Sequence, residues 1–281
     1  MDLAEPIDTA WRARLQLGFE RRDAATILSR REHRGPLRIQ KPLYPEGEAV
    51  CHGIVLHPPS GIVGGDELAI EVNVACGAQA LLTTPGAGKW YRSAGPRATQ
   101  RLHFAVQAGG ALEWLPQETI VFDGARADMQ THIELAADAR FIGWEILCLG
   151  RRASGERFVS GDFRLATRLF LGERLAWLER GQLEGGSPLL QSAVGLAGFS
   201  VSGTLLALGP GLDTSLLANC RAVAVKEGCA RTGITVLPDL LVARYLGHAS
   251  EAAREWFAAL WRILRPTLLG RAAQMPRIWS T

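Results

Sequence analysis

A strand–corner–strand unit recurs about every 30 residues through much of this chain. The unit is a short apolar strand, a two- or three-residue turn and a second apolar strand, with turn positions at residues 78, 111, 139 and 174. Such a recurrence is typical of stacked strand pairs in a β-solenoid or a layered sandwich. We therefore predict a mainly β fold with a layered or helical, β-solenoid-like architecture and about two or three helices toward the C-terminus.

Apolar patterning and proline placement predict the strands and the extent of the fold. Strands are expected at residues 11–19, 25–29, 50–56, 68–75, 79–84, 199–208, 229–236 and 240–246. The polar segment 31–42 contains two prolines and is expected at a sheet edge, because proline cannot donate a ladder hydrogen bond. No Ser/Gly/Pro-rich linker divides the chain, so 1–281 is expected to form a single domain, with 1–10 frayed and 266–281 a C-terminal tail.

Two segments have clear signals for a helix. Asp213 or Thr214 can cap a helix that runs to about Ala222. Ser250 is the expected N-cap of a second helix over 251–264, which Pro266 would end. The apolar residues of this second helix fall at helical spacing and form one broad face that includes Trp256, Phe257 and Trp261. This face is expected either to pack on the sheet or to remain exposed as a docking surface.

Composition excludes several classes of protein. The net charge is only +3 and the arginines are scattered, so nucleic acid is not an expected partner. The five cysteines form no C-x-x-C pair, which favours reduced thiols over a disulfide framework or a zinc site. The N-terminal residues are acidic and lack the apolar core of a secretory signal, and no apolar run is long enough to span a bilayer. We therefore expect a cytoplasmic protein with no membrane partner.

Nucleotide, hydrolase and closed metal sites all lack their sequence signals. The Ala-Gly-Lys at 87–89 has neither the upstream glycine nor the following hydroxyl of a phosphate loop, and Gly-x-Ser-x-Gly is absent. His52 and His57 are five residues apart on a strand and should face opposite ways. His103 and His132 each stand alone in a predicted strand, so no histidine–carboxylate set is expected to bind a metal tightly.

Several carboxylates lie within or beside apolar and aromatic runs. A carboxylate in such surroundings is costly unless it is paired or hydrated. Each could pair with one of the many arginines, could lie on the solvent face of an alternating strand, or could line a wet interior passage. These carboxylates are Asp66, Glu113, Glu118, Asp123, Glu145 and Glu179.

Several motifs, in the same order, are similar to those of the urease accessory protein D family (UreD, also called UreH). They are His33–Pro42, the corner His57–Asp66, Leu82–Ser93, Leu112–Ala125, Glu145–Arg151, Gly155–Phe158 and the tail Pro276–Thr281. The resemblance implies a non-enzymatic chaperone of urease maturation. Such a protein would link apo-urease to the accessory proteins F and G, the latter a GTPase. It would hold no cofactor tightly and would serve as a conduit for Ni²⁺ in transit.

The resemblance also gives the candidate residues a role. Asp66, Glu118, Glu145 and Glu179 would contact nickel transiently, because strong coordination would stop its transfer. The second helix and the tail would dock the F partner through Trp256, Phe257, Trp261, Arg277 and Trp279. Two rival functions are a carbohydrate-binding β-solenoid module and a hydrolase that uses the His57–Asp66 corner. The latter lacks a nucleophile and an anion-binding loop, and the former lacks a regular aromatic ladder.

Overall fold

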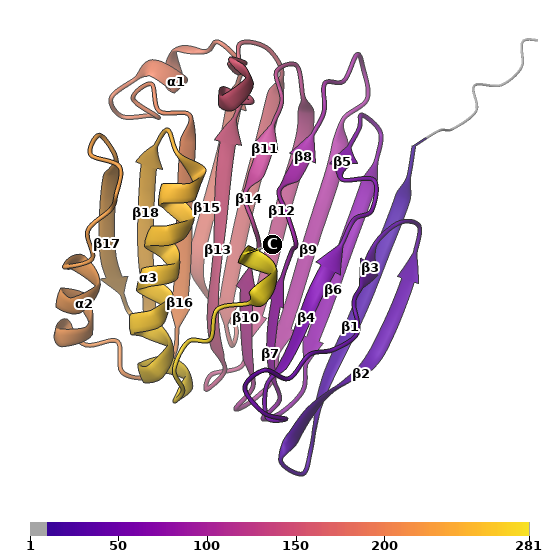
Figure 1. The fold of residues 1–281 in the computed structure, drawn as a ribbon, viewed down its shortest axis with the longest axis vertical. Helices are drawn as coiled ribbons and strands as arrows, with labels where there is room; N and C mark the ends of the chain where they lie inside the picture. The colour runs from indigo at the N-terminus through magenta and orange to yellow at the C-terminus, as the bar shows by residue number, and fades with distance from the viewer. Residues whose placement is uncertain (1–9, 281) are drawn as a thin grey trace, which may run out of the picture.

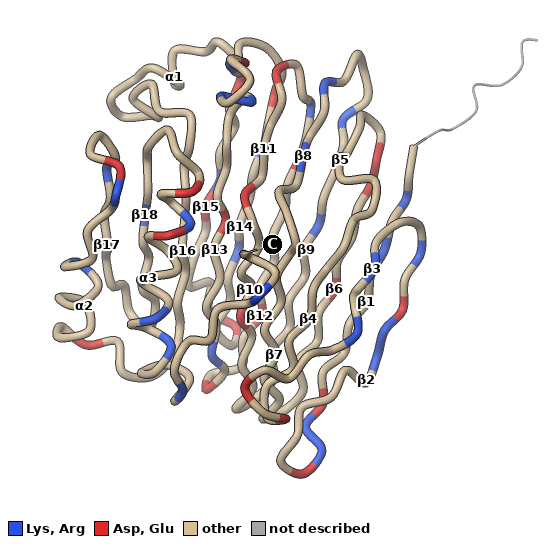
Figure 2. Tube along the Cα trace, in the orientation of Figure 1, with Lys and Arg blue, Asp and Glu red and all other residues tan. Residues whose placement is uncertain are grey.

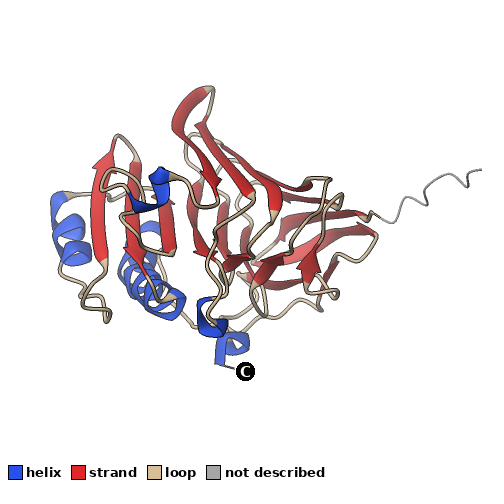
Figure 3. Ribbon diagram, turned by 90° about the horizontal axis from the view of Figure 1, so that it is seen from above, coloured by secondary structure: helices blue, strands red, loops and turns tan. Residues whose placement is uncertain are grey.

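Two β-sheets face one another, and helices lie outside the two strand layers (Figures 1 and 3). The computed structural model describes residues 10–280. The first sheet has seven strands, in the order β15 (Arg174–Glu184), β14 (Asp162–Leu171), β12 (Arg126–Leu135), β9 (Ala98–Val106), β6 (Glu67–Val74), β1 (Arg12–Arg22) and β2 (Ala25–Arg34).

The second sheet has eleven strands. Eight follow in the order β17 (Arg231–Leu237), β18 (Leu240–Gly247), β16 (Val201–Leu208), β13 (Arg140–Leu149), β10 (Ala111–Leu115), β7 (Gln79–Thr83), β4 (Cys51–Leu56) and β3 (Arg38–Ile39). Three short strands, β5 (Gly61–Ile62), β8 (Gly88–Trp90) and β11 (Thr119–Val121), continue this sheet beside β13. The segment 31–42 was predicted to lie at a sheet edge because it contains two prolines. Its first residues, 31–34, belong to β2, and residues 38–39 form β3. Both strands lie at sheet edges, as predicted.

The chain alternates between the two sheets from β6 to β14, and its coils stack in parallel. In the first sheet Val74, Val106, Leu135 and Leu171 stand in register on successive strands. In the second sheet β4, β7, β10 and β13 are parallel neighbours. This arrangement confirms the predicted mainly β, β-solenoid-like fold of stacked strand pairs.

The fourth repeat differs from the other three. After β6, β9 and β12 the chain takes a four-residue corner into the second sheet, whereas β14 and β15 are joined by residues 172–173 alone and pair antiparallel. A two-residue turn returns the chain beside itself, so this copy is a hairpin within one sheet. The longer corners use Gly77 and Gly109 at φ of 66° and 65°, a backbone conformation that glycine adopts without steric cost.

Three α-helices confirm the predicted number. They are α1 (Pro188–Gln191), α2 (Thr214–Arg221) and α3 (Ser250–Leu269), and two 3₁₀ turns, η1 (Arg152–Ser154) and η2 (Arg277–Ser280), accompany them. The Asp213 carboxylate accepts a 2.7 Å hydrogen bond from the Leu216 N–H and caps α2 as predicted.

The predicted boundaries of the long helix were wrong at both ends. The N-cap of α3 is Ala249, which provides no side-chain hydrogen bond, so Ser250 does not cap it. The helix also continues beyond Pro266 to Leu269 and stops at Gly270, whose φ is 71°. A proline inside a helix removes one N–H donor but leaves its own carbonyl available, and the Gly270 N–H bonds to the Pro266 carbonyl.

Two hydrophobic clusters hold the layers together. One lies between the sheets, and the other lies between the second sheet and α2 and α3. Trp256, Phe257 and Trp261 are at most 3% exposed in this second cluster, so of the two placements expected for this face, the structure shows packing on the sheet and not exposure. All five cysteines are free thiols. Acidic and basic residues intermix along the described trace (Figure 2). The frayed start predicted for 1–10 falls almost wholly on residues 1–9, outside the described residues.

Candidate interior passage

Two cavities lie between the sheets and share Trp114 and Glu145 in their walls. The first has a volume of about 70 Å³ and is lined by residues of β9, β12, β13, β14, β15 and β16. The second has a volume of about 260 Å³ and extends toward the corners at 57–62 and 84–89. A cavity needs only about 10–15 Å³ of such space to hold a water molecule, so both are large enough for water.

Glu145 is the one ionisable side chain among the described residues that lines both cavities. It projects from β13, and its Oε1 accepts a 2.6 Å hydrogen bond from the Thr119 hydroxyl. No lysine, arginine or histidine forms an ion pair with it in the described part of the chain. Burial raises the pKa of Glu145 to about 7, although the side chain keeps partial contact with the cavities. The carboxyl therefore changes charge near neutral pH.

Glu179 lies in the wall of the first cavity and joins the two sheets. Its Oε1 accepts a hydrogen bond from Arg244, which also donates to the Thr204 hydroxyl at 3.0 Å. Because Glu179 belongs to β15 and Arg244 to β18, this ion pair bridges the facing sheets at the cavity wall. A cation that reaches Glu179 would have to compete with the Arg244 guanidinium.

The other two predicted carboxylates line neither cavity. Asp66 is buried, and its two oxygens each accept a 2.9 Å hydrogen bond from a backbone N–H, one of Trp11 and the other of Val63. This geometry gives Asp66 a structural role in closing the corner. Glu118 is half-buried between β10 and β11. The structure therefore brings together Glu145 and Glu179, but neither Asp66 nor Glu118, along the cavities.

Sequence reasoning missed His57 as a passage residue. It lines the second cavity, and its Nε2 is buried without a hydrogen-bond partner among residues 10–280. Burial lowers the pKa of His57, so the ring is neutral at pH 7 and can offer a lone pair to a metal. His52 instead contacts Glu46 at 2.6 Å, so the two histidines share no site, as their spacing predicts. The position of His57 directly after an apolar strand was the available signal.

The C-terminal tail packs back onto the second sheet. The indole N–H of Trp279 donates to the Thr83 hydroxyl at 2.8 Å, and its ring lies 5.8 Å from that of Trp144 and 6.1 Å from that of Trp261. Trp279 is therefore a half-buried anchor of the tail, whereas Arg277 is exposed. Arg277 is the one residue of the predicted docking set that is largely open to solvent in this fold.

Comparison with known proteins decides the family. The family model described as "UreD urease accessory protein" matches residues 12–280. The chain belongs to the UreD family. It is 58% identical over 275 residues to "Urease accessory protein UreD" of Dechloromonas aromatica (strain RCB), covering 97% of this chain and 95% of that relative. It is 55% identical over 271 residues to the protein of the same name from Azoarcus sp. (strain BH72), covering 96% and 94%.

The UreD resemblance seen in the sequence motifs is thus confirmed over nearly the whole chain. A more distant relative, "Urease accessory protein UreD" of Methylobacillus flagellatus, is 45% identical over 274 residues and covers 98% of this chain. The shared name describes an accessory role and not a catalytic one. Within residues 10–280, no helix is both long and apolar enough to cross a membrane.

Proposed function

We propose that this UreD family member is a non-enzymatic, cytoplasmic chaperone of urease maturation that links apo-urease to the accessory proteins F and G and conducts Ni²⁺. Family membership supports a role in urease maturation. The conduit is supported chiefly by one observation: the Glu145 carboxyl, which forms no ion pair with another of residues 10–280, lines both cavities.

The donors along this route suit a metal in transit. Carboxylate oxygens, threonine hydroxyls and one imidazole are spread over both cavities, with Glu145, Glu179, Thr204 and His57 among them. A stable nickel site would gather several such donors around one ion, whereas dispersed donors hold it weakly at each step. Because Glu145 must lose its proton to bind a metal, occupancy at Glu145 rises with pH through about 7.

The rival hydrolase function gains no support at the His57–Asp66 corner. Both oxygens of Asp66 accept backbone N–H groups, which leaves its carboxylate committed to the corner. His57 faces the second cavity, where its Nε2 has no hydrogen-bond partner among residues 10–280 and the Ser60 hydroxyl instead accepts a 3.3 Å hydrogen bond from Lys89. We therefore retain the maturation role alone.

The scaffold part of the proposal predicts an effect at the exposed tail. Arg277→Glu should reduce co-purification of the accessory protein F with the untagged full chain, because the substitution reverses a charge on an exposed segment. The control is Arg31→Glu, at an exposed position of β2, outside α3 and the tail. Co-expression of apo-urease, F and G with the wild-type chain, with each variant or with no chain provides the measurement.

Two results would count against this assignment. Urease that gains full nickel and activity without the chain would contradict the maturation role itself. Undiminished recovery of F with Arg277→Glu would contradict only the tail as its docking surface, so the two failures are distinguishable.

A further inference from the structure

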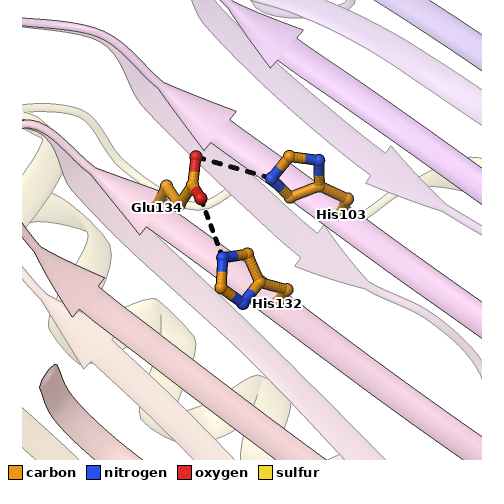
Figure 4. Close-up of side chains that lie close together, drawn as sticks. All are labelled: His103, His132 and Glu134. Carbon is orange, nitrogen blue, oxygen red and sulfur yellow. Dashed lines mark hydrogen bonds and ion pairs between the residues drawn. The ribbon is translucent and has the colours of Figure 1, made fainter.

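A second group of potential metal ligands lies on the outer face of the seven-stranded sheet, away from the cavities. His103 of β9 and His132 of β12 stand directly in register, and Glu134 follows one pleat along β12 (Figure 4). The prediction that each histidine stands alone was therefore wrong, because parallel pairing places residues 29 positions apart side by side. The flanking residues Leu102 and Ile133 are buried, so alternation points the three polar side chains outward.

The three side chains converge on a small volume. The Glu134 carboxylate lies 2.8 Å from His132 Nε2 through one oxygen and 3.5 Å from His103 Nε2 through the other. One potential ligand atom from each residue lies within 4.8 Å of the others. Metal–nitrogen bonds of about 2.0–2.1 Å require ligand atoms about 3–4 Å apart, which small rotations of exposed side chains can produce. We propose that His103, His132 and Glu134 bind one divalent late first-row transition-metal ion.

The chemistry of the set defines the class of ion. Two imidazoles and one carboxylate favour Cu²⁺, Ni²⁺ or Zn²⁺ and discriminate against Mg²⁺ and Ca²⁺, which require oxygen ligands. Three protein ligands leave further coordination positions open to water or to a group from another molecule. The site is thus built for exchange at the surface and does not depend on the interior passage.

The neighbouring groups keep the ligands available. Glu71 lies beside His103 in register, but its oxygens already accept hydrogen bonds from Arg14 and Gln16, so it is engaged elsewhere. The ring of Phe170 lies 5.3 Å from that of His132 and offers no competing ligand atom.

The test uses the full-length chain without a polyhistidine tag. Binding of Ni²⁺ at pH 7.5 is measured by calorimetric titration. His103→Ala and His132→Ala should each weaken one binding event by about tenfold or more. A loss of this size already follows when a group that hydrogen-bonds to a metal ligand is removed. The control is His33→Ala, at an exposed histidine of β2 outside the cluster. Cu²⁺ should bind more tightly than Ni²⁺.

A second measurement does not depend on the variants. In the wild-type chain labelled with ¹⁵N-histidine, substoichiometric Cu²⁺ should broaden the signals of His103 and His132 first among the six histidines. Broadening of His57 or His33 instead, or unchanged Ni²⁺ affinity in both cluster variants, would overturn the proposal.

Discussion

Replacement of Arg265 by methionine is expected to lower the free energy of unfolding by about 3–5 kcal/mol, the cost of breaking a buried ion pair from one side. The Arg265 side chain is fully buried in α3. It donates to both oxygens of Glu113 at 2.9–3.1 Å and to both oxygens of Glu46 at 2.5 and 2.7 Å. Methionine would leave these two carboxylates without their shared cation.

The effect is large because the network ties three parts of the chain together. Glu113 lies on β10, Glu46 precedes β4, and Arg265 also donates to the carbonyl of Ala272 in the tail. Burial alone would raise the pKa of Glu46, but hydrogen bonds from His52 and Arg265 lower it to about 2, so this buried carboxylate is charged in the wild-type fold and loses one of its two stabilising partners when the arginine is replaced.

Urea denaturation of the purified chain at pH 7.5 measures this effect. Arg262→Met is the matched control, because Arg262 is exposed on the same helix and its loss should change stability by less than about 0.5 kcal/mol. A loss at Arg265 no greater than that of the control would show that the buried network does not stabilise α3.

Replacement of Glu145 by glutamine is expected to stabilise the chain at pH 8 and to have little effect at pH 4.5. The folded-state pKa of Glu145 is raised to about 7 by burial, against 4.5 for the free side chain. The folded state therefore binds more protons than the unfolded state between these values, and the stability of the wild type falls as pH rises through this window. Above it the deficit reaches about 3 kcal/mol, at 1.36 kcal/mol per pKa unit.

Glutamine preserves the shape of the side chain and can still accept the hydrogen bond from the Thr119 hydroxyl. The difference between variant and wild type, measured by denaturation at several pH values, isolates this one group from all others that titrate. Glu118→Gln is the control, since Glu118 is a half-buried glutamate that lines neither cavity. A difference that is independent of pH between 4.5 and 8 would contradict a raised pKa at Glu145.

The sequence was sufficient for the architecture but not for the contacts between distant strands. The spacing of the corners near 78, 111 and 139 predicted the stacked coils, because each unit carries its own apolar strands and turn. The hairpin formed by β14 and β15 could not be distinguished from a fourth coil, since the two-residue and the four-residue connections are both short, are built of small or polar residues and lie between apolar strands.

The candidate site, like the fold, could be predicted from the sequence only in part. The apolar neighbours of Glu145 and Glu179 placed both carboxylates in the interior, where each lines a cavity. The role of Asp66 depends on a backbone N–H 55 residues away, and the pairing of His103 with His132 depends on strand register. Neither the contact between Asp66 and the distant backbone N–H nor the register that pairs His103 with His132 can be read from a local sequence pattern, so both required the structure.

The nickel content of urease tests the central claim most directly. Urease should be matured with F and G and either the wild-type chain, the double variant Glu145→Gln/Glu179→Gln, or the Glu118→Gln control, and its nickel measured per active site. The double variant should join the complex normally but deliver severalfold less nickel at limiting Ni²⁺, because two oxygen ligands of the cavities have lost their charge. Nickel loading by the double variant equal to that of the wild type would contradict a passage through these cavities.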